Sequence, residues 1–220
     1  MYHYIEDKEF LKKLRSVCSN LVNQLVQEIN NEGKMIVVAH SVGSGSRNLE
    51  TQNEFEPVDL DYNISIISSW NINDCQGIKE YIRKKFNVIL NRNGWGDCQD
   101  STSALTTEYR NFTSGNKTRF SIDLGIVVED SNGSWWRLIH QKTGNTRNDV
   151  WIWNEGRNSY NLNKKVDWLK NHNYWNEVRE GYLTKKNMYL TRNDYNHPSF
   201  ICYIEAVNEV YDRYNHRKKS

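Results

Sequence analysis

Residues 37–67 of the chain, VVAHSVGSGSRNLETQNEFEPVDLDYNISII, contain the pattern that decides the fold. The run begins as an apolar strand and turns at Gly43-Ser44-Gly45-Ser46, and after a polar loop it enters a second strand that carries Asp59 and Asp61. A turn of small residues can expose backbone N–H groups to phosphate oxygens. Two acids on a neighbouring strand suit a divalent cation. The stretch therefore indicates a phosphate-binding turn that faces a metal site.

The second strand, expected over residues 58–67, alternates with a period of two. Asp59 and Asp61 therefore point to the same side, close enough to share a divalent ion. Like charges at this spacing are unfavourable unless a cation neutralises them. A bare Asp-x-Asp also occurs on ordinary exposed strand faces, so the pair alone leaves that alternative open. One face carries Leu60, Tyr62, Ile64 and Ile66, and the other carries Asp59, Asp61, Asn63 and Ser65.

A third acid, Asp123, lies on a later strand expected over residues 119–129. Its neighbours on the same strand face are small, and the opposite face is apolar throughout. A carboxylate in such a place needs a partner, because an unpaired buried charge is costly. A metal ion shared with the acids of the earlier strand would supply one. The structural alternative is a salt bridge to an arginine such as Arg119 or Arg47.

The rest of the chain mixes helices with strands, which predicts an α/β (α+β) fold with a small mixed sheet flanked by helices. We expect residues 1–145 to form the core and residues 146–220 to form a helical, aromatic-rich part packed on it. The strand at 35–39 is apolar throughout, as in a strand covered on both faces. Helices are expected over residues 7–31, 166–172 and 175–187, and another begins after Pro198. One more helix is expected to start at a cap, Asn73 or Asp74, and to run to residue 91. Further strands are expected over 104–110 and 134–142.

Composition narrows the functional classes. The 220 residues carry a net charge of +2, which is too small to indicate a nucleic-acid-binding protein by electrostatics alone. The N-terminal segment lacks the pattern of a signal peptide, and no apolar run is long enough to span a membrane. The cysteines are far apart and form no Cys-x-x-Cys pair, so we expect reduced thiols, mostly buried, in a cytoplasmic protein. They are Cys18, Cys75, Cys98 and Cys202.

These motifs together resemble the pattern of the DNA polymerase β-like nucleotidyltransferase superfamily. That pattern is a Gly-Ser after a first strand, an acid-x-acid on the second and a third acid on a later strand. Here the parts are Gly43-Ser44, Asp59-Leu60-Asp61 and Ile122-Asp123-Leu124, within residues 35–128. The segment GSGSRN resembles the GSGARG-type segment of the family, with Asn48 where glycine is usual. The interval between turn and acids is also longer than in the commonest members.

The resemblance implies a magnesium-dependent, ATP-binding nucleotidyltransferase. Two Mg²⁺ ions, with Mn²⁺ as an alternative, would be held by Asp59, Asp61 and Asp123 and would bind the triphosphate of an NTP, with ATP the expected donor. Asp123 would also help to deprotonate the acceptor hydroxyl. The residues expected to contact the nucleotide are Gly43, Ser44, Gly45 and Arg47, with Lys185 and Lys186 as more distant candidates that could equally be solvated surface lysines.

The acceptor is left open by the sequence. In similar proteins it is a small molecule such as an antibiotic, a nucleotide, an RNA end or a protein side chain, and the near-neutral charge disfavours a long RNA. Two other functional classes compete with an enzyme. One is a non-catalytic nucleotide- or partner-binding module that keeps the fold, and the other is a structural metal-binding domain unrelated to nucleotides.

Overall fold

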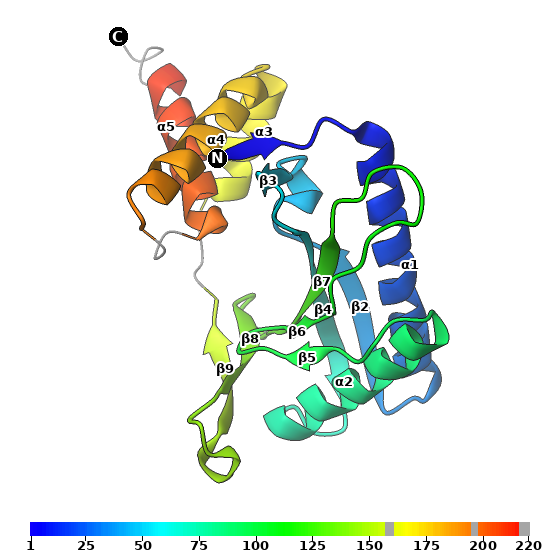
Figure 1. Ribbon diagram of the computed structural model, residues 1–220. Coiled ribbons are helices and arrows are strands. Elements are labelled where there is room, and N and C mark those ends of the chain that lie inside the picture. Colours follow the sequence, from blue (N-terminus) through cyan, green and yellow to red (C-terminus); the bar gives the residue numbers. More distant parts are fainter. Residues whose placement is uncertain (157–160, 195–197, 216–220) are drawn as a thin grey trace. The chain divides into compact units, whose positions relative to one another are not determined.

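The computed structural model describes residues 1–156, 161–194 and 198–215 (Figure 1). Its main element is a seven-stranded sheet in which β2, β4, β7, β6 and β5 follow in that order, with β8 and β9 extending from β7. Strands β4 and β7 are parallel and the other pairs are antiparallel, so the expected mixed sheet is confirmed. The strands are β2 (Met35–Ser41), β4 (Val58–Ser69), β5 (Gln99–Asp100), β6 (Leu105–Thr106), β7 (Phe120–Glu129), β8 (Trp135–Gln141) and β9 (Val150–Glu155).

Two long helices, α1 (Lys8–Asn31) and α2 (Cys75–Arg92), pack beside this sheet. Their apolar stripes and starting points match the sequence expectation, and the Asp74 carboxylate accepts a hydrogen bond from the backbone N–H of Gly77 as the N-cap of α2. Tyr62 places α1 on one particular face of the sheet, since its hydroxyl lies 2.9 Å from that of Ser19. This is the face that carries the even-numbered residues of β4, so the odd-numbered residues, including both acids, lie on the opposite face.

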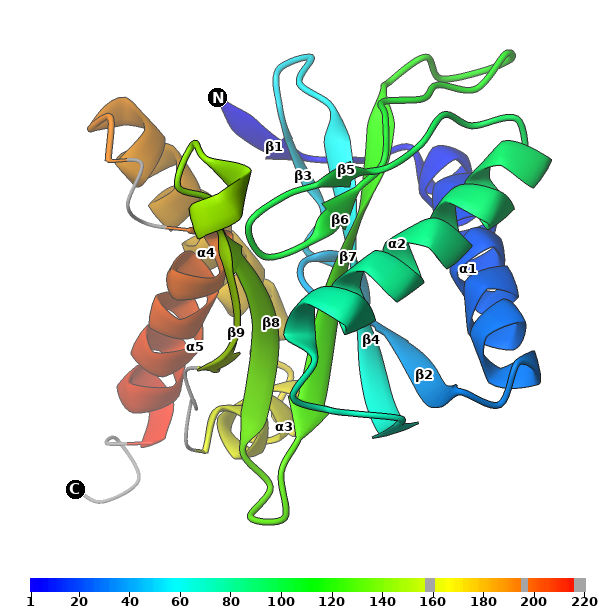
Figure 2. The ribbon, with the colours of Figure 1, turned by 90° about the horizontal axis from the view of Figure 1, so that it is seen from below.

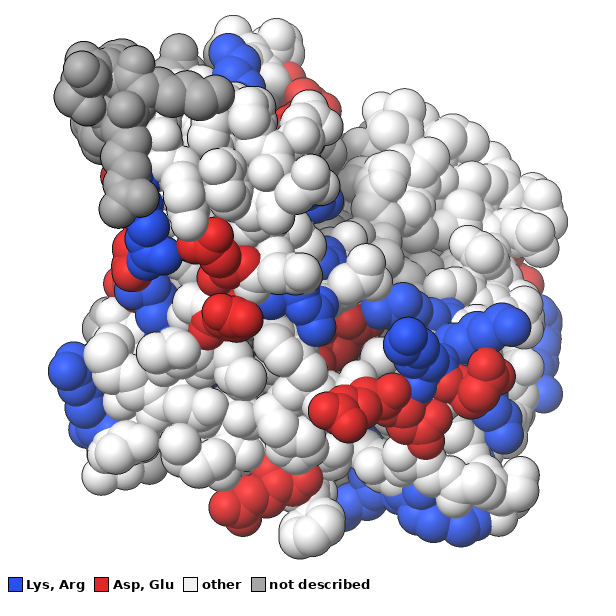
Figure 3. Space-filling model, turned by 90° about the horizontal axis from the view of Figure 1, so that it is seen from above, with Lys and Arg blue, Asp and Glu red and all other residues white. Residues whose placement is uncertain are grey.

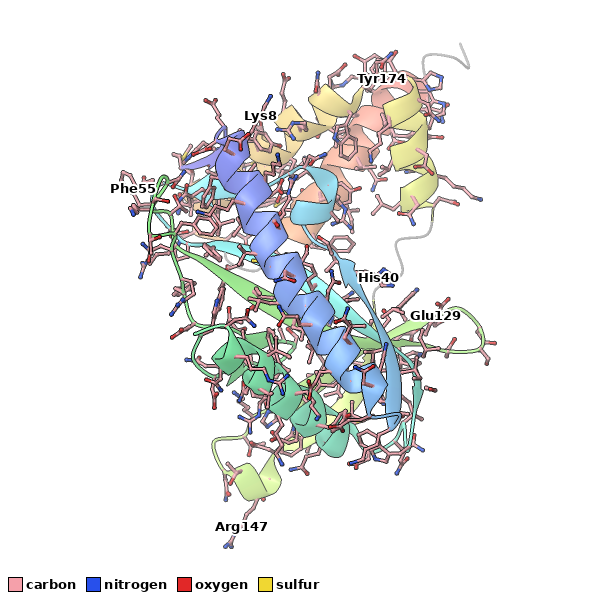
Figure 4. All side chains as sticks on the ribbon, turned by 90° about the vertical axis from the view of Figure 1, so that its right-hand side faces the viewer. Lys8, His40, Phe55, Glu129, Arg147 and Tyr174 are labelled. Atoms are coloured by element: carbon pink, nitrogen blue, oxygen red, sulfur yellow. The ribbon has the colours of Figure 1, made fainter. Side chains whose placement is uncertain are left out.

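Strand β2 corrects one expectation. We expected this apolar strand to be covered on both faces, but Ile36 and Val38 are 40% and 39% exposed. The reason is that β2 is the edge strand, paired only with β4, and a single helix layer covers one of its faces. His40 is also exposed on this strand (Figure 4).

The remaining elements differ from expectation mainly in length. The strand expected over 104–110 is reduced to the two-residue β6 and a separate bridge between Arg110 and Phe120. Residues 150–155, which were expected within a helical part, form instead the strand β9, which pairs with β8 throughout its length. Between them, η2 (Thr146–Asn148) carries Arg147, whose side chain points away from the protein (Figure 4).

By its internal contacts the chain forms two compact units. The larger comprises Glu6–Asn48 and Glu56–Arg157 and contains the sheet with α1 and α2. The smaller comprises Met1–Ile5, Leu49–Phe55 and Asn158–Ser220. The division at residue 145 stays a prediction. The smaller unit contains β1 (Tyr2–Tyr4), β3 (Thr51–Asn53), α3 (Leu162–Asn171), α4 (Trp175–Thr191) and α5 (Ser199–Asn215).

Two further expectations can be compared with the structure. All four cysteines are free and buried, as the spacing predicted. Within the described ranges, no helix combines the length and the apolar character needed to cross a bilayer.

Candidate active site

The three aspartates lie together on the sheet face opposite α1, a surface that we call the acid face. Strands β4 and β7 run parallel and in register, which places Asp61 directly opposite Asp123 and Asp59 opposite Ser121. Neighbouring strands are about 4.8 Å apart, and Asp59 precedes Asp61 by two residues on the same face. Figure 2 shows β4, β7 and β8 side by side. The shared face expected from the alternation is therefore present.

Mutual repulsion and burial act strongly on Asp61. Burial raises the pKa of this carboxyl to about 6, and the nearby charges of Asp123 and Asp59 act in the same direction. Arg137 and Arg47 lower that pKa by smaller amounts. Partial loss of solvation at its carboxyl also raises the pKa of Asp59, although the residue as a whole is exposed. The acid face therefore holds more negative charge than its own residues neutralise.

Hydroxyl groups, rather than cations, satisfy two of the three acids. Ser121 donates a hydrogen bond from its hydroxyl to Asp59. Thr106 of β6 donates to the Oδ1 atom of Asp123 over 2.6 Å. In the described part of the chain, the carboxylate of Asp61 accepts no hydrogen bond and forms no ion pair. Both hydroxyl bonds can be exchanged for a cation by rotation of side chains, because no backbone group is involved.

The glycine-serine turn folds directly onto Asp61. Gly43 has a φ of +66°, and a Cβ atom added there would lie 2.1 Å from the Oδ2 atom of Asp61. The backbone N–H of Val42 also donates to the carbonyl oxygen of Asp61 over 2.9 Å. The Gly43 carbonyl accepts hydrogen bonds from Ser46 Oγ at 3.1 Å and from Arg47 Nη1 at 2.5 Å. Glycine is therefore required at position 43 for backbone conformation and for space.

The other positions of the turn have different backbone conformations. Gly45 does not use a left-handed conformation; it begins the 3₁₀ helix η1 (Gly45–Arg47). Asn48 follows with φ 56° and ψ 43°, in the left-handed region that asparagine tolerates better than most residues. This explains how asparagine can stand where similar segments have glycine. Ser44 directly precedes η1, at the bend above Asp61.

The two distant lysines, Lys185 and Lys186, belong to the smaller unit, on α4. The Nζ atom of Lys185 lies 3.0 Å from a carboxylate oxygen of Glu209. That of Lys186 donates to Thr51 Oγ1 over 2.8 Å and lies 3.8 Å from the ring centre of Tyr2. Both have partners within their own unit, and their role as nucleotide contacts stays a prediction.

The sequence reasoning missed Arg137, an arginine on β8. Its Nη2 atom donates to Asn63 Oδ1 on β4 over 3.0 Å. Burial lowers the pKa of this guanidinium, and the negative charges of Asp61 and Asp123 oppose that effect. A signal was available in the sequence, since Arg137 is the one charged residue in the β8 segment WWRLIHQ. What the sequence lacked was the pairing that places this residue on the acid face.

The salt bridge considered for Asp123 is not formed. Within the described residues Asp123 has no ion pair, and its hydrogen-bond partner is Thr106. Arg47 bonds to the turn instead. The guanidinium of Arg119 lies 5.5 Å from the ring centre of Tyr109.

The donor set fits a hard divalent cation in its chemistry and in its shared sheet face. Carboxylate oxygens are the ligands that Mg²⁺ and Mn²⁺ prefer, and three of them share one sheet face. In the conformation described for residues 1–156, 161–194 and 198–215, no three acidic, histidine or cysteine side chains are close enough together to hold an ion as they stand. In this conformation Ser121 and Thr106 donate hydrogen bonds to two of the carboxylates.

No family model and no curated protein matches the chain, but solved structures do. CdnC from Escherichia coli MS115-1, solved with ATP, is 13% identical over 92% of this chain and 61% of its own, with a TM-score of 0.59. The CdnC:HORMA-deltaN complex from the same strain is 14% identical over 92% of this chain and 60% of its own, with a TM-score of 0.58. The CdnE cyclic dinucleotide synthase of Elizabethkingia meningoseptica was solved with GTP and Apcpp. It is 12% identical over 86% of this chain and 68% of its own, with a TM-score of 0.51.

These likenesses concern the fold. The chain has the fold of the DNA polymerase β-like nucleotidyltransferases, as the motif pattern predicted. It spans about three-fifths of the length of the CdnC chains that it matches.

Proposed function

We propose that this protein is a divalent-metal-dependent nucleotidyltransferase that moves a nucleoside monophosphate from an NTP, with ATP the expected donor, to a hydroxyl acceptor. The observation that carries the proposal is the uncompensated acid face beneath the Gly43 turn. Burial raises the pKa of Asp61 there to about 6, and no described residue forms an ion pair with its carboxylate. The nucleotidyltransferase fold supports the same conclusion.

In this proposal Asp59, Asp61 and Asp123 hold two Mg²⁺ ions, or Mn²⁺ in their place. Bound there, the ions would stabilise the attacking and leaving oxygens of an in-line displacement at the α-phosphorus. Asp123 accepts the proton of the acceptor hydroxyl once its hydrogen bond from Thr106 is exchanged. With its pKa near 6, Asp61 is ionised for the most part at neutral pH and is ready to bind a cation.

The turn binds the outer phosphates of the donor. The Ser44 hydroxyl and the backbone N–H groups around η1 are hydrogen-bond donors beside Asp61. Arg47 stands at the end of the same turn and adds a positive charge. These contacts orient the β- and γ-phosphates, which leave as pyrophosphate.

The acceptor is most directly indicated by the CdnE relative. That protein is a cyclic dinucleotide synthase, so a nucleotide hydroxyl is the acceptor that we favour for this chain. A long nucleic acid is disfavoured by the small net charge. Figure 3 supports this on the face that it shows, where basic and acidic side chains are intermingled.

The proposal is tested by incubating the protein with Mg²⁺ and α-labelled NTPs, singly and in pairs, and measuring labelled product and pyrophosphate. The wild type should release pyrophosphate, and Asp61→Asn and Asp123→Asn should not. Asp97→Asn is the matched control, because Asp97 is an exposed acid bonded to Asn91. Transfer that survives in both active-site variants would refute the proposal. Nucleotide binding without pyrophosphate release would favour the non-catalytic module.

A further inference from the structure

Arg137 lies across the acid face, over a glycine that makes room for it. Strand β8 pairs with β7 so that Arg137 is opposite Val127, two residues along the same strand face from Gly125. A Cβ atom added at Gly125 would lie 3.1 Å from both Cζ and Nη1 of Arg137 and 2.8 Å from Asn63 Oδ1. The guanidinium therefore rests on the bare backbone of Gly125, beside the row that contains Asp61 and Asp123.

The guanidinium is held by one hydrogen bond and by the field of the acids. Its Nη2 atom donates to Asn63 Oδ1 over 3.0 Å. Among the described residues it makes no ion pair with a carboxylate, so it is near Asp61 and Asp123 without contacting them. Their charges attract it, although it is half-buried and loses solvation there. The side chain supplies positive charge to the acid face while leaving the carboxylate oxygens unoccupied.

We propose that Arg137 is the resident counter-ion of the acid face and that it opposes the binding of divalent cations by Asp61 and Asp123. The inference rests on the function proposed above. A cation entering between these carboxylates is attracted by them and repelled by the guanidinium, and charges in a half-buried site are only partly screened. Arg137 therefore keeps the affinity for free ions low.

The same charge couples ion entry to the nucleotide. A triphosphate that arrives with the ion brings negative charge, which the guanidinium attracts and which offsets the repulsion of the ion. The ion should therefore bind more tightly with the nucleotide than alone. Arg137 would in this way favour loading by the ion–nucleotide complex over loading by free ions.

The test measures the affinity of Mn²⁺ alone, by electron paramagnetic resonance of the free ion, in metal-depleted protein without nucleotide. Arg137→Gln and Arg137→Met should each bind Mn²⁺ roughly fivefold more tightly than the wild type, as expected when one nearby positive charge is removed. Arg137→Lys keeps the charge and should stay close to the wild type. Arg92→Gln is the matched control, because Arg92 lies on α2 and pairs with Glu28 of α1. Thermal unfolding identifies any variant that is not folded. If either Arg137→Gln or Arg137→Met fails to fold, the Mn²⁺ affinity of the other one tests the inference.

Equal or weaker Mn²⁺ binding by both neutral variants, beside a wild type that binds, would overturn this inference and leave the proposed function intact. Absence of Mn²⁺ binding in all of these proteins would instead overturn the metal site of the proposed function and this inference with it. With ATP present, the Mn²⁺ affinity of the neutral variants should exceed that of the wild type by only about twofold or less, because the triphosphate then interacts with Arg137 in the wild type. An affinity difference as large with ATP as without it would overturn the proposed coupling between ion and nucleotide binding.

Discussion

The larger compact unit contains two clusters of charged side chains that differ in how their charges are balanced. In the first cluster, the Nζ atom of Lys79 lies 2.6 Å from Asp100 Oδ1. The two ring nitrogens of His140 face Asp100 Oδ2 at 2.8 Å and Asp149 Oδ2 at 3.0 Å. The ring of Trp151 stacks on this histidine, with ring centres 4.2 Å apart. Every charged group of this cluster faces a partner of opposite or complementary character.

The acid face is the opposite case. Asp59, Asp61 and Asp123 share one surface, and Arg137, whose charge acts on Asp61 and Asp123, makes no ion pair with them in the described part of the chain. Folding alone does not produce such an arrangement, because unmatched acids at close range reduce stability. One cluster is therefore complete in itself, whereas in the proposed function the other is completed by a bound cation.

The largest expected effect is a loss of nucleotidyl transfer when an acid of the acid face is replaced. Asp61→Asn should lower the rate of nucleotidyl transfer by about 10³-fold or more, because it removes a proposed metal ligand of the acid face. Without metal, the same variant should be at least as stable as the wild type, since one repelling charge is gone. Rate measurements and urea unfolding of the same preparations check both parts. A variant that is much less stable would show that Asp61 has a structural role like that of Asp100.

Asp100→Ala should show the reverse behaviour. The Lys79 side chain is 1% exposed, so removing its partner leaves a buried charge unpaired and should lower the free energy of unfolding by about 3 kcal/mol. Urea unfolding measures the loss, and Asp97→Ala on the surface serves as the control. A change as small as that of the control would mean that the His140 cluster is not held together by its charges.

Gly43→Ala tests the contact between the turn and the acid face. The new Cβ would meet the Asp61 carboxylate, and alanine is also strained at a φ of +66°. Gly33→Ala is a close control, because Gly33 has a φ of +70° with no heavy atom near its missing Cβ. The control should lose about 1 kcal/mol of stability from backbone strain, and Gly43→Ala should lose about 1–2 kcal/mol more. Equal losses in urea unfolding would show that the turn can move away from Asp61 without cost.

The smallest expected effect is a pH dependence of the metal-free protein. The folded-state pKa of Asp61 is about 6, above its ordinary value of 3.8. A raised carboxyl pKa contributes stability at low pH, and that contribution is lost as the pH rises through the folded-state value. When the pH rises from 4.5 to 7.5 in the presence of a chelator, the free energy of unfolding of the wild type should therefore fall by about 1 kcal/mol more than that of Asp61→Asn. Parallel curves for the two proteins would contradict the raised pKa, because groups that do not interact with Asp61 contribute equally to both curves.

The sequence predicted those parts of the site that depend on local periodicity. Alternation in β4 and β7 placed Asp59, Asp61 and Asp123 on the correct faces, and the glycine signal located the turn at Gly43. Apolar stripes and capping residues located α1 and α2 within one or two residues. Each of these features is determined by residues close together in the chain.

Features that depend on strand order could not be found in this way. The pairing of β8 with β7 brings Arg137 onto the acid face, and the two-residue β6 brings Thr106 to Asp123. The exposure of Ile36 follows from the edge position of β2, which local hydrophobicity does not reveal. Sheet order is set by contacts between distant segments, so a single sequence without structural information leaves it undetermined.

The proposed function requires the acid face to bind divalent cations together with a nucleotide. It is tested most directly by a crystal of the protein soaked with Mn²⁺ and a non-hydrolysable NTP, with anomalous differences recorded for manganese. We expect at least one manganese peak coordinated by carboxylate oxygens of Asp61 and Asp123, with the outer phosphates at the Gly43 turn. A bound nucleotide with no manganese at these carboxylates would contradict it.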